Sequence, residues 1–178
     1  MMRPMKYICI LAAGTLCILT GCANASLPGQ MDKIYLTGGQ FTTTAQVVKD
    51  QFTAQVEIAR ESPQSCKLGF LSPDTLQGME YIFTQGAVEL RYQELCVSLP
   101  PDAVPAGSIA KLAVSALEQA SIPGGVESSR EGESILLSGF TENGAFTIYL
   151  DAQDRTPRKL LVPRENLEIV FENFEYLQ

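Results

Sequence analysis

The stretch FTTTAQVVKDQFTAQVEI, residues 41–58, decides the fold class of this chain. From residue 41 to 48 the series Phe41, Thr43, Ala45 and Val47 alternates with more polar residues, and from residue 52 to 58 apolar residues again recur at every second position. Asp50-Gln51 separates the two runs. A period of two places alternate side chains on opposite faces of a β-strand, so each run has one buried and one wet face. Two such runs joined by a short polar break predict a β-hairpin.

Runs of the same character continue toward the C-terminus. Turn-forming residues separate them, and Asn143-Gly144 is the strongest hairpin signal among these breaks. The polar segment 126–133 is predicted to be a loop or a weak strand. Further strands are predicted at 66–70, 79–84, 88–92, 95–99, 134–140, 145–150, 158–162 and 166–174. The whole pattern predicts about ten strands in a large antiparallel sheet.

Residues 106–121 change period and predict the one main helix. Their apolar residues recur at the spacing of a helix face, with Ser108 as the N-cap and Pro123-Gly124-Gly125 after the end. One side of this helix is too apolar for solvent, and a concave sheet needs a cover. We therefore predict a mainly β (α+β) fold, in which the helix covers the concave face of a strongly curved antiparallel sheet, or unclosed β-barrel.

Eight apolar residues are the candidate lining between helix and sheet. We expect the helix to pack on the strands, with Ile109, Leu112, Ala116 and Leu117 facing Val56, Ile58, Leu68 and Phe70. The pattern leaves open whether these residues line a cavity or form a packed core, because small barrels are filled by their own side chains. A continuous apolar hollow of about 300 Å³ or more would favour a ligand. A filled interior with a large exposed apolar patch would favour a protein partner.

The N-terminus predicts the location of the protein. Basic residues within 1–6 precede the apolar run Tyr7–Leu19, as in a secretory signal peptide. The sequence Leu19-Thr20-Gly21-Cys22 resembles the lipobox of bacterial lipoproteins, which implies cleavage between Gly21 and Cys22 and a diacylglycerol on the Cys22 thiol. An uncleaved transmembrane helix is the alternative, but the run falls short of the roughly 20 residues that span a bilayer. We expect a signal peptide at 1–21, a lipidated Cys and tether at 22–39, and a folded domain at 40–178, held by lipid at the extracytoplasmic face of the cell membrane.

Composition excludes several classes of function. The net charge of −7 argues against nucleic acid as a partner. Because the chain has no His, no Ser-His-Asp or Cys-His arrangement and no His-ligated zinc or haem site can form. By strand parity Cys66 falls on a buried face and Cys96 on a wetter one, so we expect two free thiols. We predict no catalytic residue, no metal, no cofactor and no enzyme.

The order of several motifs resembles the Lol lipoprotein carrier and receptor fold, and in particular Gram-positive, clostridial-type lipoproteins of that fold. The motifs are the Phe-Thr repeats at Phe41 and Phe52, LGFLSPDTLQG at 68–78, VELRYQEL at 88–95, FTIYLD at 146–151 followed by Pro157, and LEIVFENF at 167–174. Over residues 40–176, the resemblance implies an unclosed, curved β-barrel with an apolar hollow capped by helices. In the Gram-negative carriers that hollow takes lipoprotein acyl chains, whereas the clostridial spore-germination lipoproteins support a protein partner.

These observations lead to two hypotheses of function. The first is a membrane-anchored, non-enzymatic lipoprotein that acts as an interaction or support module for a protein of the cell or spore envelope. We expect this lipoprotein to be a monomer. The alternative is a binding protein that shelters an acyl chain or another apolar ligand in the half-barrel.

Overall fold

A computed structural model describes residues 36, 39–62 and 64–177 of the chain. The chain divides into two units, residues 1–30 and 31–178, and the fold described is that of the second. Among the described residues no helix is long and apolar enough to cross a membrane. The described elements are β1 (Phe41–Lys49), β2 (Phe52–Ser62), β3 (Ser65–Ser72), β4 (Glu80–Thr84), β5 (Ala87–Tyr92), β6 (Leu95–Leu99), the 3₁₀ turn η1 (Pro101–Ala103), α1 (Ile109–Ser121), β7 (Val126–Glu131), β8 (Ser134–Thr141), β9 (Gly144–Asp151), β10 (Pro157–Val162), the 3₁₀ turn η2 (Pro163–Glu165) and β11 (Leu167–Tyr176).

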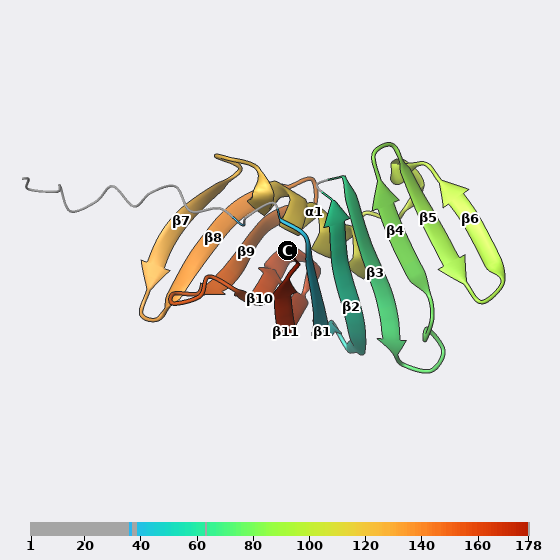
Figure 1. Ribbon diagram of the computed structural model, residues 1–178, viewed down its shortest axis with the longest axis horizontal. Helices are drawn as coiled ribbons and strands as arrows, with labels where there is room; N and C mark the ends of the chain where they lie inside the picture. Colours follow the sequence, from blue (N-terminus) through green and yellow to red (C-terminus); the bar gives the residue numbers. More distant parts are fainter. Residues whose placement is uncertain (1–35, 37–38, 63, 178) are drawn as a thin grey trace, which may run out of the picture. The chain divides into compact units, whose positions relative to one another are not determined.

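The strands form one antiparallel sheet in the order β6-β5-β4-β3-β2-β1-β11-β10-β9-β8-β7. The first six strands run outward from β1 as a meander, and the last five return to β11, which pairs with β1 at the centre (Figure 1). Strands β6 and β7 are the two edges, so the sheet does not close on itself. The predicted fold class is confirmed: a mainly β, unclosed, curved sheet with one α-helix in the described part of the chain.

The structure has eleven strands where the sequence predicts about ten. The additional strand is β7, in the segment predicted to be a loop or a weak strand. Its residues are polar and mostly exposed, so burial does not hold it in place. It pairs with β8 over six residue pairs, from Val126 opposite Gly139 to Glu131 opposite Ser134, and these main-chain bonds define the strand.

The hairpin predicted from residues 41–58 is confirmed. β1 and β2 pair from Phe41 opposite Arg60 to Lys49 opposite Phe52. Alternate residues of β1 are buried as the period requires, and in β2 Ala54, Val56 and Ile58 are buried. Phe52 belongs to the same series but is 37% exposed. It is the first residue of its strand, next to the turn, where the sheet extends past the buried core.

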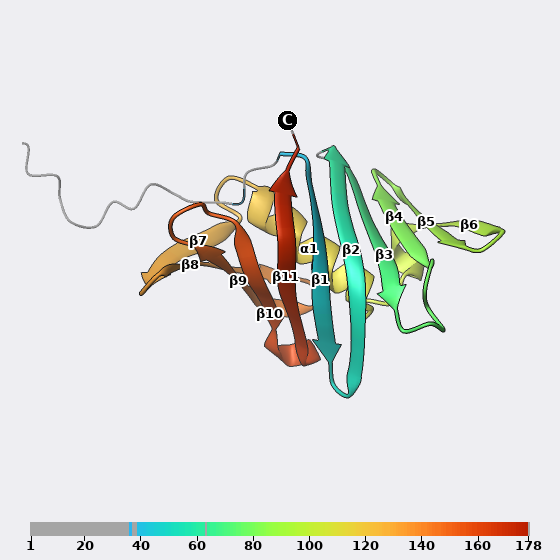
Figure 2. The ribbon, with the colours of Figure 1, turned by 60° about the horizontal axis from the view of Figure 1, so that its bottom comes forward.

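The helix crosses one face of the sheet over its central strands (Figure 2). The Ser108 hydroxyl accepts a hydrogen bond from the Lys111 amide at 3.3 Å, which satisfies one of the free donors of the first turn and confirms the predicted N-cap. Ala110 and Val114 are buried in addition to the predicted apolar face, so the helix is covered on more than one side. Its main chain lies near β8 along more of its length than it lies near β3.

The core joins these layers, and it extends N-terminal to β1. Leu36 is buried within it, and the Leu36 amide donates a hydrogen bond to the Ala120 carbonyl at the end of α1, at 2.8 Å. The predicted boundary between tether and domain lies at residue 39. Contacts with the folded domain therefore include at least one residue of the predicted tether.

Candidate interaction surface

The eight predicted lining residues lie together in the main hydrophobic cluster under α1. Val56, Ile58, Leu68 and Phe70 of the strands are buried there with Ile109, Leu112, Ala116 and Leu117 of the helix. Three surface hollows, of about 380, 420 and 560 Å³, contain none of the eight among their lining residues. All eight belong to the hydrophobic core of the described part of the chain. Gly21 and Cys22 lie outside the described residues, so cleavage and lipid attachment stay predictions.

The inward face of the sheet continues past the helix onto β4, β5 and β6. Residues directly paired across antiparallel strands share a face, so the strand register shows which side chains continue the core. One row runs from Leu68 through Tyr81 and Leu90 to Val97, and a second runs from Cys66 through Phe83 and Val88 to Leu99. We define the β4–β6 apolar face as Tyr81, Phe83, Val88, Leu90, Tyr92, Leu95, Val97 and Leu99.

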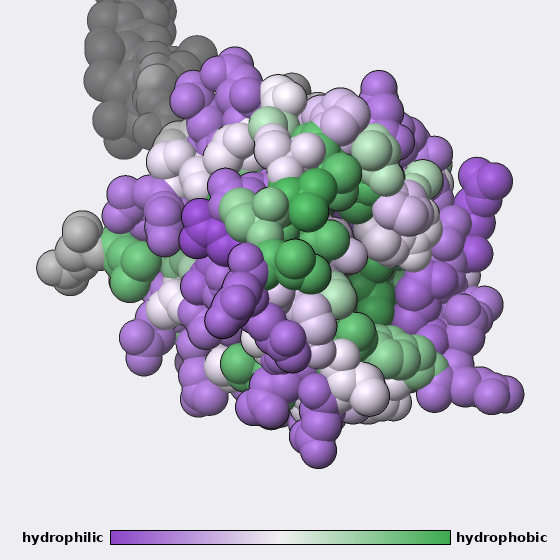
Figure 3. Space-filling view, turned by 90° about the vertical axis from the view of Figure 1, so that its right-hand side faces the viewer, coloured by the Kyte–Doolittle hydropathy of each residue, from purple (hydrophilic) through white to green (hydrophobic). Residues whose placement is uncertain are grey.

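Exposure rises along this face with distance from the helix. Leu68, at the core end of the first row, is fully buried, whereas Val97 is 47% and its neighbour Leu95 68% exposed. The reason is geometric. A helix of 13 residues is about 20 Å long, while eleven strands spaced about 4.8 Å apart span roughly 48 Å. One helix cannot cover such a sheet, and Figure 3 shows hydrophobic residues gathered on the side where β6 lies, with hydrophilic residues around them.

The other flank of the sheet is uncovered too, but its chemistry differs. The inward positions of β7 are Val126, Ser128 and Arg130, which pair with Gly139, Leu137 and Ile135 of β8. Two of these three inward residues are polar, as expected for a strand that faces solvent. The corresponding positions of β6 are Leu95, Val97 and Leu99. The inward positions of β6 are therefore apolar, although α1 does not cover this strand.

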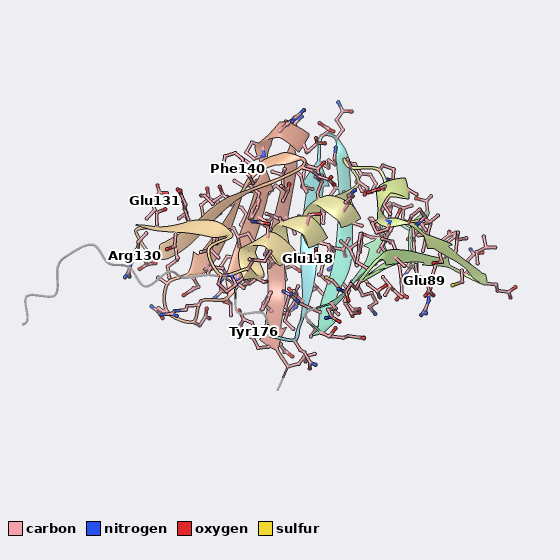
Figure 4. All side chains as sticks on the ribbon, turned by 90° about the horizontal axis from the view of Figure 1, so that it is seen from above. Glu89, Glu118, Arg130, Glu131, Phe140 and Tyr176 are labelled. Atoms are coloured by element: carbon pink, nitrogen blue, oxygen red, sulfur yellow. The ribbon has the colours of Figure 1, made fainter. Side chains whose placement is uncertain are left out.

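The outward face of β5 and β6 is polar. Cys96 donates a hydrogen bond from Sγ to Oε1 of Glu89 at 2.9 Å, and Arg91 pairs with the same carboxylate. The hydrogen bonds from Cys96 and Arg91 hold the pKa of Glu89 below its ordinary value, and the bond to Glu89 raises the pKa of the Cys96 thiol. Figure 4 labels Glu89 on its strand. The two strands are thus amphipathic, and their apolar side faces inward.

A separate hollow of about 560 Å³ opens where α1 ends, beside the β2–β3 and β4–β5 turns. Six of its eight lining residues are polar or charged: Arg60, Gln64, Thr84, Gln85, Glu118 and Ser121, with Ile122 and Pro123 completing the wall. Arg60 donates from Nη1 to the Ser121 hydroxyl at 2.6 Å, which fixes the guanidinium against the end of the helix. Burial raises the pKa of Glu118, and the nearby Arg60 opposes this shift.

Cys66 of β3 lies directly opposite Arg60 of β2 in the strand register. Burial, with a smaller contribution from Glu118, raises the pKa of its thiol to about 12. Cys66 and Cys96 are both free, as predicted, and two strands separate β3 from β6. Within the described ranges no group of three or more His, Cys, Asp or Glu side chains could hold a metal ion.

Reasoning from the sequence missed the β4–β6 apolar face as a site, although the signal was present. The runs 79–84, 88–92 and 95–99 were predicted strands, and their alternate apolar residues were visible. Comparing the length of the one predicted helix with the width of the predicted sheet would have shown that the helix cannot cover every strand. The hollow at Arg60 had no such signal, because its residues come from three separate segments.

Comparisons with known proteins support the fold. No protein-family model matches the sequence, and no curated protein matches it. Among solved structures, an uncharacterized conserved protein from Thermus thermophilus is 15% identical with a TM-score of 0.50, over 79% of this chain and 80% of that one.

Two further solved structures are similar at lower TM-scores. A LolA superfamily protein from Nitrosomonas europaea is 7% identical over 83% of this chain and 90% of that one, with a TM-score of 0.44. The complex of the CwlD amidase with the GerS lipoprotein from Clostridioides difficile gives 16% identity over 76% and 84%, with a TM-score of 0.46. At these identities the similarities concern the fold alone.

Proposed function

We propose that this chain is a membrane-anchored extracytoplasmic lipoprotein that binds a protein partner of the cell or spore envelope through the β4–β6 apolar face, without catalysing a reaction. One observation carries the proposal. Beneath α1 the inward side chains are buried, whereas on the edge strand β6 the inward side chains of Leu95 and Val97 are 68% and 47% exposed. This is the combination that favours a protein partner over a ligand.

The chemistry of the face suits a protein surface. Burying one Leu or Val side chain contributes about 1.5–3 kcal/mol relative to leaving it in water. Leu95 and Val97 together thus offer several kcal/mol to a partner that covers them. Tyr81 and Tyr92 add aromatic area with a polar end, a residue type enriched at protein interfaces. Contiguous exposed apolar patches of this kind mark interaction sites.

Shelter of an acyl chain is the second candidate. The hollow at Arg60 favours it by volume, because about 560 Å³ lies in the range of small-molecule sites. Its lining includes the charged side chains of Arg60 and Glu118, which an acyl chain in the hollow would have to avoid. The partner hypothesis therefore accounts for more of the structure.

The test compares two aromatic positions on opposite faces. A photoreactive phenylalanine replaces Tyr92 on the β4–β6 apolar face or, as the matched control, the exposed Phe140 on the outward face of β8 (Figure 4). After illumination of intact cells, we expect position 92, and not position 140, to give one adduct with another protein, identified by mass spectrometry. Equal labelling at both positions would contradict the proposal. An adduct of twice the mass of this chain would show self-association and would not support a different protein partner.

Binding of a fluorescent fatty acid to the purified lipoprotein separates the two candidates. The partner hypothesis expects no saturable binding. Saturable binding that Ile122→Arg abolishes, with no adduct at position 92, would establish the second candidate instead.

A further inference from the structure

We propose that β6 is a self-pairing edge, through which two copies of this chain join their sheets antiparallel about Val97. This uses the main-chain edge of β6, whereas the proposed function uses the face of β4–β6. The two can therefore succeed or fail separately.

The first argument is the contrast between the two edges of the sheet. An edge strand presents unpaired main-chain donors and acceptors, and proteins protect such edges with charged residues, proline or bulges. The edge strand β7 reads Val-Glu-Ser-Ser-Arg-Glu, with three charged residues in six. The edge strand β6 reads Leu-Cys-Val-Ser-Leu, with neither charge nor proline. The fold protects one edge and leaves the other open to another strand.

The second argument identifies the occupant as a second copy. In the pattern Leu95-Cys96-Val97-Ser98-Leu99, apolar and small polar residues are arranged symmetrically about Val97. An antiparallel pair centred there places Val97 opposite the second copy's Val97, and Leu95 opposite Leu99. The apolar side chains of both copies then lie on the same face, as the two-fold symmetry of most dimers requires. Strand β6 is thus complementary to itself.

The residues that flank β6 allow this register. Centred on Val97, the pairing places Glu94 opposite Pro100 rather than opposite another acid, so like charges do not meet across the junction. Pro100 and Pro101 end the strand, since proline cannot donate to a ladder, and they limit the pairing to five residues in each copy. A junction this short is weak in dilute solution. Anchoring both copies in one membrane would raise their effective concentration.

The consequence is that the inward faces of two half-barrels become continuous. The rows that end at Val97 and Leu99 in one copy continue into the second, which covers part of the most exposed apolar surface of β6. The proposed dimer differs from the monomer that the sequence predicts.

The test determines the register by disulfide formation in membranes. The full lipoprotein carries Cys96→Ser, so that the buried Cys66 is the only described thiol left, together with one new cysteine. Residues directly opposite each other have Cα atoms about 4.5–5.5 Å apart, which a disulfide can bridge. With mild oxidant we expect Val97→Cys to shift to twice the chain mass on a non-reducing gel. Leu95→Cys and Leu99→Cys alone should remain monomeric, but cells that express both should form the dimer band.

Two controls make the outcome decisive. Phe140→Cys, at a position 75% exposed on the outward face of β8, should give no dimer band. Adding Val97→Lys to the Leu95→Cys and Leu99→Cys pair should abolish their band without changing the unfolding midpoint, because it places two ammonium groups opposite each other at a half-exposed site. Bands of equal strength at positions 95, 97, 99 and 140 would mean random collision and overturn the inference. So would an unshifted Val97→Cys, or its coupling to a different protein.

Discussion

Replacing Leu112 by Ala tests whether the interior beneath the helix is packed. Leu112 is 2% exposed and belongs to the cluster that joins α1 to the sheet. The change removes three carbon atoms, each contributing about 0.8 kcal/mol on burial, which gives about 2.4 kcal/mol. The hole left behind adds to this when surrounding atoms cannot close it, and Leu→Ala changes in cores cost about 2–5 kcal/mol. We expect a loss of about 3–4 kcal/mol, because strands and helix hold the site from both sides.

The assay is urea and thermal unfolding of the full chain with Cys22→Ser, followed by circular dichroism. At about 2–4 °C per kcal/mol, the thermal midpoint should fall by roughly 6–16 °C. Leu177→Ala is the control: it removes the same atoms from a side chain that is 46% exposed, and should change stability by about 0.5 kcal/mol or less. A loss below about 1 kcal/mol at Leu112 would show loosely packed walls and refute the packed interior. A gain in fatty-acid binding by the variant would refute it as well.

Three further outcomes follow from the chemistry of single residues. Cys22→Ser should release the protein from membranes or leave an uncleaved precursor, and a mature-length protein that still fractionates with membranes would contradict lipid attachment. A maleimide should label Cys96 in the folded protein but Cys66 only after unfolding, as read by mass spectrometry, because burial raises the pKa of Cys66 to about 12. Hydrogen bonds from Thr156 hold the pKa of Asp154 below its ordinary value, so this group stabilises the fold at neutral pH and the stabilisation is lost as the pH falls through the lowered pKa. Thr156→Val should move the Asp154 pKa upward in an NMR titration, and an unchanged pKa would contradict the assignment.

Much of the fold could be predicted because the spacing of apolar residues among sequence neighbours specifies its strands and its helix. The period of two in residues 41–58 determines which side chains of β1 and β2 are buried, and the structure agrees at all inward positions except Phe52. The same parity placed Cys66 inside and Cys96 outside. The change to a period of 3.6 after Pro105 located α1 to within a few residues, with Ser108 at its start. These features depend on neighbours in sequence, so the sequence alone can specify them.

β7 was uncertain because main-chain pairing, rather than an apolar pattern, defines it. Pairing depends on which strand lies beside β7, and the local sequence does not specify the neighbouring strand.

By itself, then, the sequence of this protein determined its β-rich class, the helix after Pro105, the buried side of Cys66 and the exposed side of Cys96, and the expectation of a lipid anchor at Cys22. Only the tertiary structure decided that β1 and β11 meet at the centre, that β6 and β7 become edges, and that Leu95 and Val97 of β6 stay exposed. The physical reason is the distance along the chain between the residues that interact. Strand and helix periods follow from the geometry of adjacent residues. Coverage depends on how far a helix about 20 Å long reaches across a curved sheet whose neighbouring strands can lie more than 100 residues apart in the chain.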